Sequence, residues 1–123
     1  MKIYVSHCKS YDFFHELYVP LRNAVFNSLH EIILPHEDTL EQFNSKEVIS
    51  TCDLVLAEVS YPAIGVGMEL GWANIYEIPV ICLYKEGKPL AGSLSVITKN
   101  FLEYKNAIDM VSKIDKELQK IYL

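Results

Sequence analysis

Residues 53–59 read D-L-V-L-A-E-V, and residues 79–84 read P-V-I-C-L-Y. Both runs are almost continuously apolar, which is typical of strands that are buried on both faces of a parallel sheet. Residues 67–76 lie between the two runs and are predicted to be helical. A strand, a helix and a second strand within about 30 residues form a crossover unit, and such a unit predicts that its two strands are parallel.

The same alternation continues on both sides of this unit. Further strands are expected at Lys2–Ser6, Glu31–Leu34 and Phe101–Tyr104, and further helices at Asp12–Leu29, Asn44–Thr51 and Asn106–Tyr122. Pro20 is expected to kink or split the first of these helices. The sequence therefore predicts an α/β protein with three layers, in which a five-stranded parallel sheet of the Rossmann or flavodoxin type has helices on both faces.

Two of the predicted helices carry apolar residues at helical spacing, which indicates the face that each turns to the sheet. In the first helix these residues are Phe14, Leu17, Tyr18, Leu21, Val25 and Leu29. In the last helix they are Ile108, Val111, Ile114, Leu118 and Ile121.

Length and composition indicate an ordinary globular protein. The chain has 123 residues, of which 50% are hydrophobic and 22% charged, and it contains no repeat or Gly/Ser-rich linker, so a single domain over residues 1–123 is expected. Its formal net charge of −5 argues against a nucleic acid polymer as partner, although a small nucleotide would need only a few local donors.

Neither a membrane, a metal nor a cofactor is expected. No apolar stretch approaches the length of a membrane span, and no signal-peptide pattern precedes the first strand, so a cytoplasmic location is expected. The three cysteines lack a C-x-x-C pair and are expected to be free thiols. The segment from His36 to Asp38 lacks the paired spacing of metal ligands.

A loop with two glycines follows the strand at residues 53–59. Residues 58–71 read E-V-S-Y-P-A-I-G-V-G-M-E-L-G, and Gly65, Val66 and Gly67 are expected to form a loop just before a helix. Glycines let the backbone approach a ligand closely and adopt positive φ, and the first amides of a helix bind anions. A phosphate is therefore a natural ligand, although neither a P-loop nor a dinucleotide fingerprint is present.

Glu69 stands close behind this loop and has two interpretations. A carboxylate near a helix N-terminus stabilises the helix by about 0.3–1 kcal/mol. Alternatively, Glu69 is a nucleophile or a base beside a phosphate-bearing substrate. Because ligands of open parallel sheets bind beyond the carboxyl ends of the strands, the loops that begin at Ser6, Pro35 and Ser60 are expected to meet beside it.

The segment C-D-L-V-L-A-E-V-S-Y-P-A-I-G-V-G-M-E-L-G-W-A (residues 52–73), followed by P-V-I-C-L-Y, resembles the nucleoside 2-deoxyribosyltransferase superfamily. It is most similar to the branch of 2′-deoxynucleoside 5′-phosphate N-hydrolases. The resemblance implies cleavage of the N-glycosidic bond of a (deoxy)nucleoside or its 5′-monophosphate, by hydrolysis or base transfer. It also implies that Glu69 is the nucleophile of a covalent glycosyl-enzyme intermediate and that no cofactor is needed.

The resemblance assigns further roles one residue at a time. It implies phosphate binding by the backbone around Gly65, Val66 and Gly67, and a place for Tyr4 beside the nucleophile. His36 matches a histidine that follows the second strand. Ser93 matches a serine that reaches the phosphate from the neighbouring subunit of a homodimer, so a homodimer or higher homo-oligomer is expected. Apart from the resemblance, Ser6 at the end of the first strand is expected to contact the substrate. His7, which follows the strand, either contacts the substrate or its departing base or is an exposed loop histidine.

The chain departs from the family pattern at three places. Ala63 replaces a serine of the phosphate loop, and Ser45 replaces an aspartate that assists the departing base. The segment Ser6-His7-Cys8-Lys9 replaces a glycine-rich first loop.

Two other functions stay open. The departures at residues 45 and 63 are compatible with a non-catalytic nucleotide-binding module on the same scaffold. The segment I-Y-V-S-H-C-K-S (residues 3–10) resembles the start of Toll/interleukin-1 receptor domains, some of which cleave NAD. Glu58, at the end of its strand, could hydrogen-bond either to a sugar or to loop amides.

Overall fold

The computed structural model describes residues 1–122. Five parallel strands form one sheet in the order β2-β1-β3-β4-β5. The strands are β1 (Lys2–Ser6), β2 (Glu31–Ile33), β3 (Leu54–Glu58), β4 (Val80–Lys85) and β5 (Phe101–Tyr104). The predicted α/β architecture with a five-stranded parallel sheet is confirmed. Strand order reverses between β1 and β3, which is where ligands bind in doubly wound sheets.

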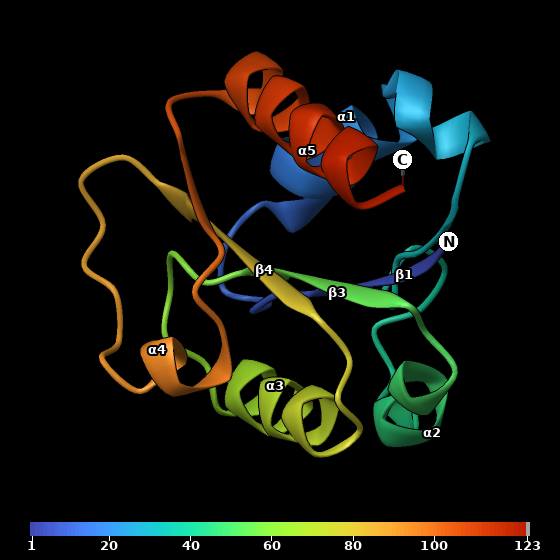
Figure 1. Cartoon of the computed structure of the whole chain (residues 1–123), viewed down its shortest axis with the longest axis vertical. Helices are drawn as coiled ribbons and strands as arrows, with labels where there is room; N and C mark the ends of the chain where they lie inside the picture. Colours follow the sequence, from blue (N-terminus) through green and yellow to red (C-terminus); the bar gives the residue numbers. More distant parts are fainter. Residues whose placement is uncertain (123) are drawn as a thin grey trace.

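Helices cover both faces of the sheet, as predicted (Figure 1). One face carries α1 (Val19–Asn23) and α5 (Ala107–Tyr122). The opposite face carries α2 (Ser45–Ser50), α3 (Ile64–Ile75) and α4 (Leu94–Ile97), of which the short α4 was not expected.

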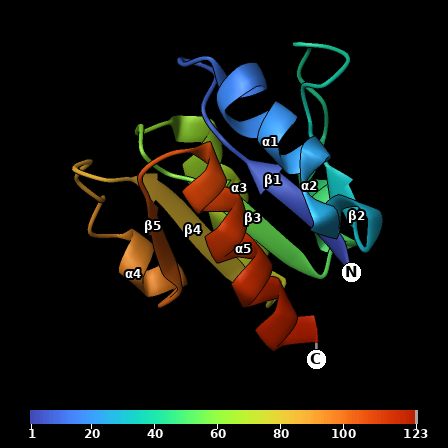
Figure 2. The ribbon, with the colours of Figure 1, turned by 90° about the horizontal axis from the view of Figure 1, so that it is seen from above.

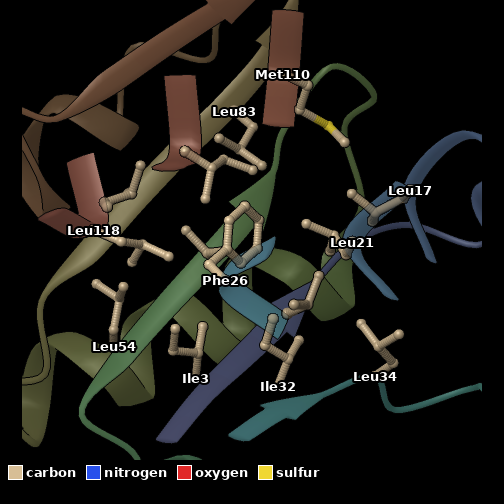
Figure 3. Packing of buried hydrophobic residues seen from close by; sticks show 14 of the residues in the cluster. Ile3, Leu17, Leu21, Phe26, Ile32, Leu34, Leu54, Leu83, Met110 and Leu118 are labelled. Carbon is tan, nitrogen blue, oxygen red and sulfur yellow. The ribbon is translucent and has the colours of Figure 1, made fainter. Parts of the chain in front are cut away.

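Each face of the sheet has its own apolar core. On the side of α1 and α5, Phe26 lies among side chains from β1, β3, β4 and α5, including Ile3, Leu54 and Leu118 (Figure 3). On the side of α3, the core includes Tyr4 and Leu70. All five residues of β3 are buried, which explains why its sequence is almost continuously apolar.

The helix predicted over residues 12–29 is broken into three pieces. A π-helical turn η1 (Phe14–Tyr18) leads into α1, and a 3₁₀ turn η2 (Val25–Ser28) follows an extended residue, Ala24, with ψ of 149°. Pro20 lies in the first turn of α1, where its missing N–H removes no helical hydrogen bond.

These breaks change which residues face the sheet. The wide π turn and the extended residue shift the helical phase, so a single 3.6-residue period no longer describes the segment. Leu17, Tyr18 and Leu21 are buried as predicted, but Phe26 is buried in place of its neighbours. The prediction was wrong for three residues that are exposed: Phe14, Val25 and Leu29.

In α5 the buried row is Met110, Ile114 and Leu118. Ile108 was predicted on this face but is 84% exposed. It lies about 120° around the helix axis from Ile114, because each residue turns the helix by about 100°. Ile121, in the last turn, is 45% exposed, also against the prediction.

The three cysteines are free and buried, as expected for thiols that take part in no disulfide. Burial raises the pKa of Cys82 to about 11. None of the helices within residues 1–122 has both the length and the hydropathy that a membrane span requires.

Candidate active site

The carboxylate of Glu69 is hydrogen-bonded to two side chains of the first strand, β1. Successive side chains of a strand point to opposite faces, so Tyr4 and Ser6 both lie on the face of β1 that α3 covers. The Tyr4 hydroxyl donates to Glu69 Oε2 at 2.6 Å, and the Ser6 hydroxyl donates to Glu69 Oε1 at 2.7 Å. Each carboxylate oxygen therefore has its own donor, which fixes the orientation of the group.

The phenol of Tyr4 is well suited to remain a donor. Burial raises its pKa, and the charge of Glu69 and the hydrogen bond to Glu69 raise it further. The hydroxyl of Ser45, which also contacts the phenol, acts in the opposite direction. Tyr4 therefore keeps its proton and stabilises a negative charge on Glu69.

The helix that carries Glu69 begins earlier than the sequence predicted. Helix α3 starts at Ile64, so Gly65 and Gly67 lie in its first turn and not in a preceding loop. Neither glycine uses a positive φ, because the positive-φ glycine among residues 1–122 is Gly87. Glu69 lies in the second turn, where the effect of the helix N-terminus has largely decayed.

The first turn of α3 has free amides. Its N-cap residue, Ala63, is extended and supplies no side-chain hydrogen bond. The first helical bond runs from Gly67 N to Ala63 O at 3.2 Å, so the amides of residues 64–66 precede the ladder. A Cβ added at Gly65 would meet no atom within 4 Å. Open space beside unpaired amides is a suitable environment for an anion.

A cavity of about 310 Å³ lies above Glu69, large enough for a small ligand. It is lined by His7, Cys8, Lys9, His36, Gln42, Ala63, Gly65, Val66 and Glu69. The loops after β1 and β2 leave the sheet at the same end, where both strands finish, and this end lies away from the two termini (Figure 2). Sequence reasoning had not singled out Gln42, because nothing in the polar loop after β2 marks it.

His7 forms part of the cavity lining, and both of its ring nitrogens are hydrogen-bonded within the protein. Its Nδ1 donates to the Cys8 carbonyl oxygen at 2.7 Å, and its Nε2 accepts from the Tyr18 hydroxyl at 2.6 Å. The same hydroxyl accepts the backbone N–H of His36 at 2.9 Å. Burial lowers the pKa of His7, so the ring is neutral with both nitrogens engaged.

Tyr18 is a residue that sequence reasoning placed only in the core. Its hydroxyl ties the loop after β1 to the loop after β2, and both loops line the cavity. Helical spacing gave no signal for this role, because a tyrosine on an apolar stripe is usually a core residue.

Ser93 lies away from the cavity in this chain. It is exposed at the start of α4 and lines a separate, mainly apolar cavity of about 320 Å³ with Gly67, Leu70 and Val96 among others. Ser93 is expected to reach the phosphate that a neighbouring subunit binds, and this role stays a prediction.

Glu58 holds the loop after β3. It accepts the Ser60 N–H at 2.6 Å and the Ser60 hydroxyl at 3.0 Å, and the Tyr104 hydroxyl also donates to it. Of the two interpretations of Glu58, loop positioning agrees with these contacts. Asp53 similarly accepts the backbone N–H of Lys2 at 2.8 Å.

No family model matches the chain. A curated bacterial protein from Syntrophotalea carbinolica, named "Putative 2′-deoxynucleoside 5′-phosphate N-hydrolase 1", is 34% identical over 77 residues. The resemblance to the N-hydrolase branch is confirmed. The match covers 52% of this chain and 54% of the relative, so the chain spans about half the length of the curated protein it matches.

Solved structures of three proteins share the fold. CMP N-glycosidase BcmB of Clostridium botulinum has a TM-score of 0.66 at 20% identity, covering 94% of this chain and 99% of that one. A conserved protein of Enterococcus faecalis has a TM-score of 0.68 at 18% identity, covering 96% and 99%. A signal receiver domain from Vibrio parahaemolyticus has a TM-score of 0.56 at 21% identity, covering 97% and 89%. Proteins of different function thus share this fold, and the function must be argued from the site.

Proposed function

We propose that this protein cleaves the N-glycosidic bond of a (deoxy)nucleoside or its 5′-monophosphate, with Glu69 as the nucleophile. The observation that carries the proposal is the carboxylate of Glu69, held at both oxygens by Tyr4 and Ser6 beneath a cavity of ligand size. The activities named for the curated relative and for the BcmB structure support the same chemistry.

The reaction proceeds in two displacements at C1′, the first on the face opposite the base and the second on the face that the base has left. A Glu69 oxygen forms a bond to C1′ while the bond between C1′ and the base nitrogen breaks, and its electron pair leaves with the base. Water, or a second base in a transfer reaction, then attacks C1′ and releases the carboxylate. The fixed negative charge faces the positive charge that develops on the sugar in both transition states.

The cavity offers donors for a 5′-phosphate. The free amides of Gly65 and Val66 lie at the N-terminus of α3, and Lys9 lines the same space. Ala63 contributes no hydroxyl, so phosphate binding here relies on backbone amides and one ammonium group.

A homodimer would cover an apolar face beside this site. Helix α3 exposes Ile64 (84%), Met68 (52%) and Ile75 (75%), and α4 exposes Val96 (78%). Gly67 lines the apolar cavity on this face, while its neighbours Gly65 and Val66 line the cavity of Glu69. The first turn of α3 therefore adjoins both the cavity of Glu69 and the apolar cavity. We propose that the partner subunit's Ser93 approaches the phosphate across this turn.

Base release by the wild-type protein and by Glu69→Gln tests the proposed function. Both proteins are incubated with nucleosides, nucleoside monophosphates of both sugars, and NAD, and free base is quantified by chromatography. We expect release by the wild type only, with matching circular dichroism spectra. Equal release by both proteins would overturn the assignment of Glu69, and release confined to NAD would favour the alternative NAD glycohydrolase.

The alternative of a non-catalytic nucleotide-binding module is favoured by Ala63 and by Ser45, which lies against Tyr4 and provides no acidic group. Thermal stabilisation by a nucleotide without release of base from any compound would support this module.

A further inference from the structure

Departure of a nucleobase requires a proton, because a base that leaves as an anion is a poor leaving group. Besides Glu69, the titratable side chains that line the cavity are His7, Cys8, Lys9 and His36. Ser45, at the position where the resemblance implies an aspartate, is a buried hydroxyl against Tyr4 and is not acidic. Among the residues that line the cavity, the candidates for the acid are therefore these four side chains.

Three of the four are unsuited to the task. Both ring nitrogens of His7 are engaged and burial lowers its pKa, so it holds no transferable proton toward the cavity. The Cys8 thiol is buried and hydrogen-bonded to Ser10 at 3.3 Å. The Lys9 ammonium group donates to the Leu40 carbonyl at 3.3 Å, and its fixed charge matches a phosphate better.

His36 differs from these three in its contacts. Its Nδ1 lies 3.1 Å from the Thr39 carbonyl oxygen, so Nδ1 carries a proton and donates it there. Within residues 1–122, Nε2 of His36 has no hydrogen-bond partner, and the ring lines the cavity that contains Glu69. A backbone carbonyl behind one ring nitrogen fixes the tautomer and leaves the other nitrogen to exchange protons with a ligand.

The position of the His36 ring is also fixed. Its centroid lies 5.9 Å from that of His7, edge-on at 86°, and 6.3 Å from that of Phe43. Its backbone N–H donates to the Tyr18 hydroxyl, which also holds His7. An acid that is held in place before the substrate arrives loses little entropy in the reaction.

We propose that His36 is the general acid that protonates the departing base, an assignment that rests on the proposed function. As the bond between C1′ and the base breaks, the Nε2 proton of the imidazolium passes to the base nitrogen, which keeps the electron pair. Neutral His36 then accepts a proton from water while the water oxygen bonds to C1′ and the ester electrons return to Glu69. The imidazolium is thereby restored, and the products are the free base and the sugar phosphate.

The test compares two leaving groups. One substrate is the nucleotide from which the wild type releases base, and the other is the 4-nitrophenyl glycoside of the same sugar phosphate, whose leaving group departs without a proton. His36→Gln should lower the single-turnover rate of leaving-group release from the nucleotide by about 10²–10⁴-fold and leave that rate for the nitrophenyl compound within about tenfold, because a single turnover of release excludes the second step. His15→Gln, at an exposed histidine paired with Asp12, is the control and should leave both unchanged.

Equal losses on both substrates in His36→Gln would assign His36 to binding or structure and overturn the proposal, as would no loss on either. His36→Gly provides a second measurement, because added imidazole should restore release of base, and failure of rescue would also contradict the proposal. Failure of the proposed function looks different: the wild type would release no base, or Glu69→Gln would retain activity on both substrates.

Discussion

Glu69 receives one hydrogen bond from each of two residues on β1, and these bonds can be removed separately. Tyr4→Phe deletes the donor to Oε2, and Ser6→Ala deletes the donor to Oε1. Hydrogen bonds to charged groups contribute about 1.5–3 kcal/mol. We expect each variant to lower kcat/KM for base release by roughly 10- to 100-fold.

The matched control is Tyr84→Phe, which removes a hydroxyl from a half-buried tyrosine on β4. This variant should keep its activity. Unchanged kinetics in both Tyr4→Phe and Ser6→Ala would show that the two donors do not assist Glu69.

The neutral state of His7 gives a prediction about acid stability. Because burial lowers the pKa of His7 in the folded protein, the unfolded chain binds its proton at higher pH. The free energy of unfolding should therefore fall as the pH drops below about 6.5, until the folded-state pKa is passed. Denaturant titrations between pH 7 and 5 measure this slope.

His7→Gln should show a smaller loss of stability over the same range. His30, whose pKa burial also lowers, is present in both proteins and does not affect the comparison. Parallel curves for wild type and variant would contradict the account of His7.

At the residue scale, the resemblance to the family placed Tyr4 beside the nucleophile, and the alternation of side chains along β1 explains why Ser6 lies on the same face. The ring of His7 and the backbone N–H of His36 both bind the hydroxyl of Tyr18. No sequence pattern predicted these two contacts. Helical spacing correctly predicted that Tyr18 is buried, but it gave no signal for the contacts of its hydroxyl.

At the scale of an element, two isoleucines of α5 differ in burial, and their truncation is expected to change the free energy of unfolding by different amounts. Ile114 is fully buried against the sheet, whereas Ile108 is 84% exposed. Ile114→Ala should lower the free energy of unfolding by about 2–5 kcal/mol, and Ile108→Ala by no more than about 0.5 kcal/mol. Chemical denaturation measures both values, and similar losses would show that the burial assigned to α5 is wrong.

Strands were easier to predict than helices in this chain. β3 and β4 are buried on both faces, so their apolar runs have clear ends, and each predicted strand is present. The start of α3 was misplaced because Ala63, its N-cap, is not a capping residue, and the glycines that follow suggested a loop. Local chemistry thus gave no signal for the true boundary.

At the scale of the whole molecule, the apolar face of α3 and α4 predicts the oligomeric state. Sedimentation at micromolar concentration should show a dimer, and Val96→Glu should convert it to a monomer. The control is Ile108→Glu, which places the same charge at an equally exposed position on α5 and should leave the dimer intact. A monomeric wild-type protein would overturn the proposed homodimer.

The same two variants test whether the second subunit completes the site. If the partner subunit's Ser93 contributes to phosphate binding, Val96→Glu should raise the KM of a nucleoside monophosphate more than that of the nucleoside. Ile108→Glu should change neither value.

The hydrogen bonds to Glu69 join residues that are 65 and 63 positions apart along the chain. Bringing distant segments together costs loop-closure entropy, so we expect these contacts to form late in folding. The site is therefore complete only after β1 has paired with β3 and α3 has docked over both. On dilution from denaturant, catalysis should return after the helical signal has recovered, so turnover reports the end of folding and not its beginning.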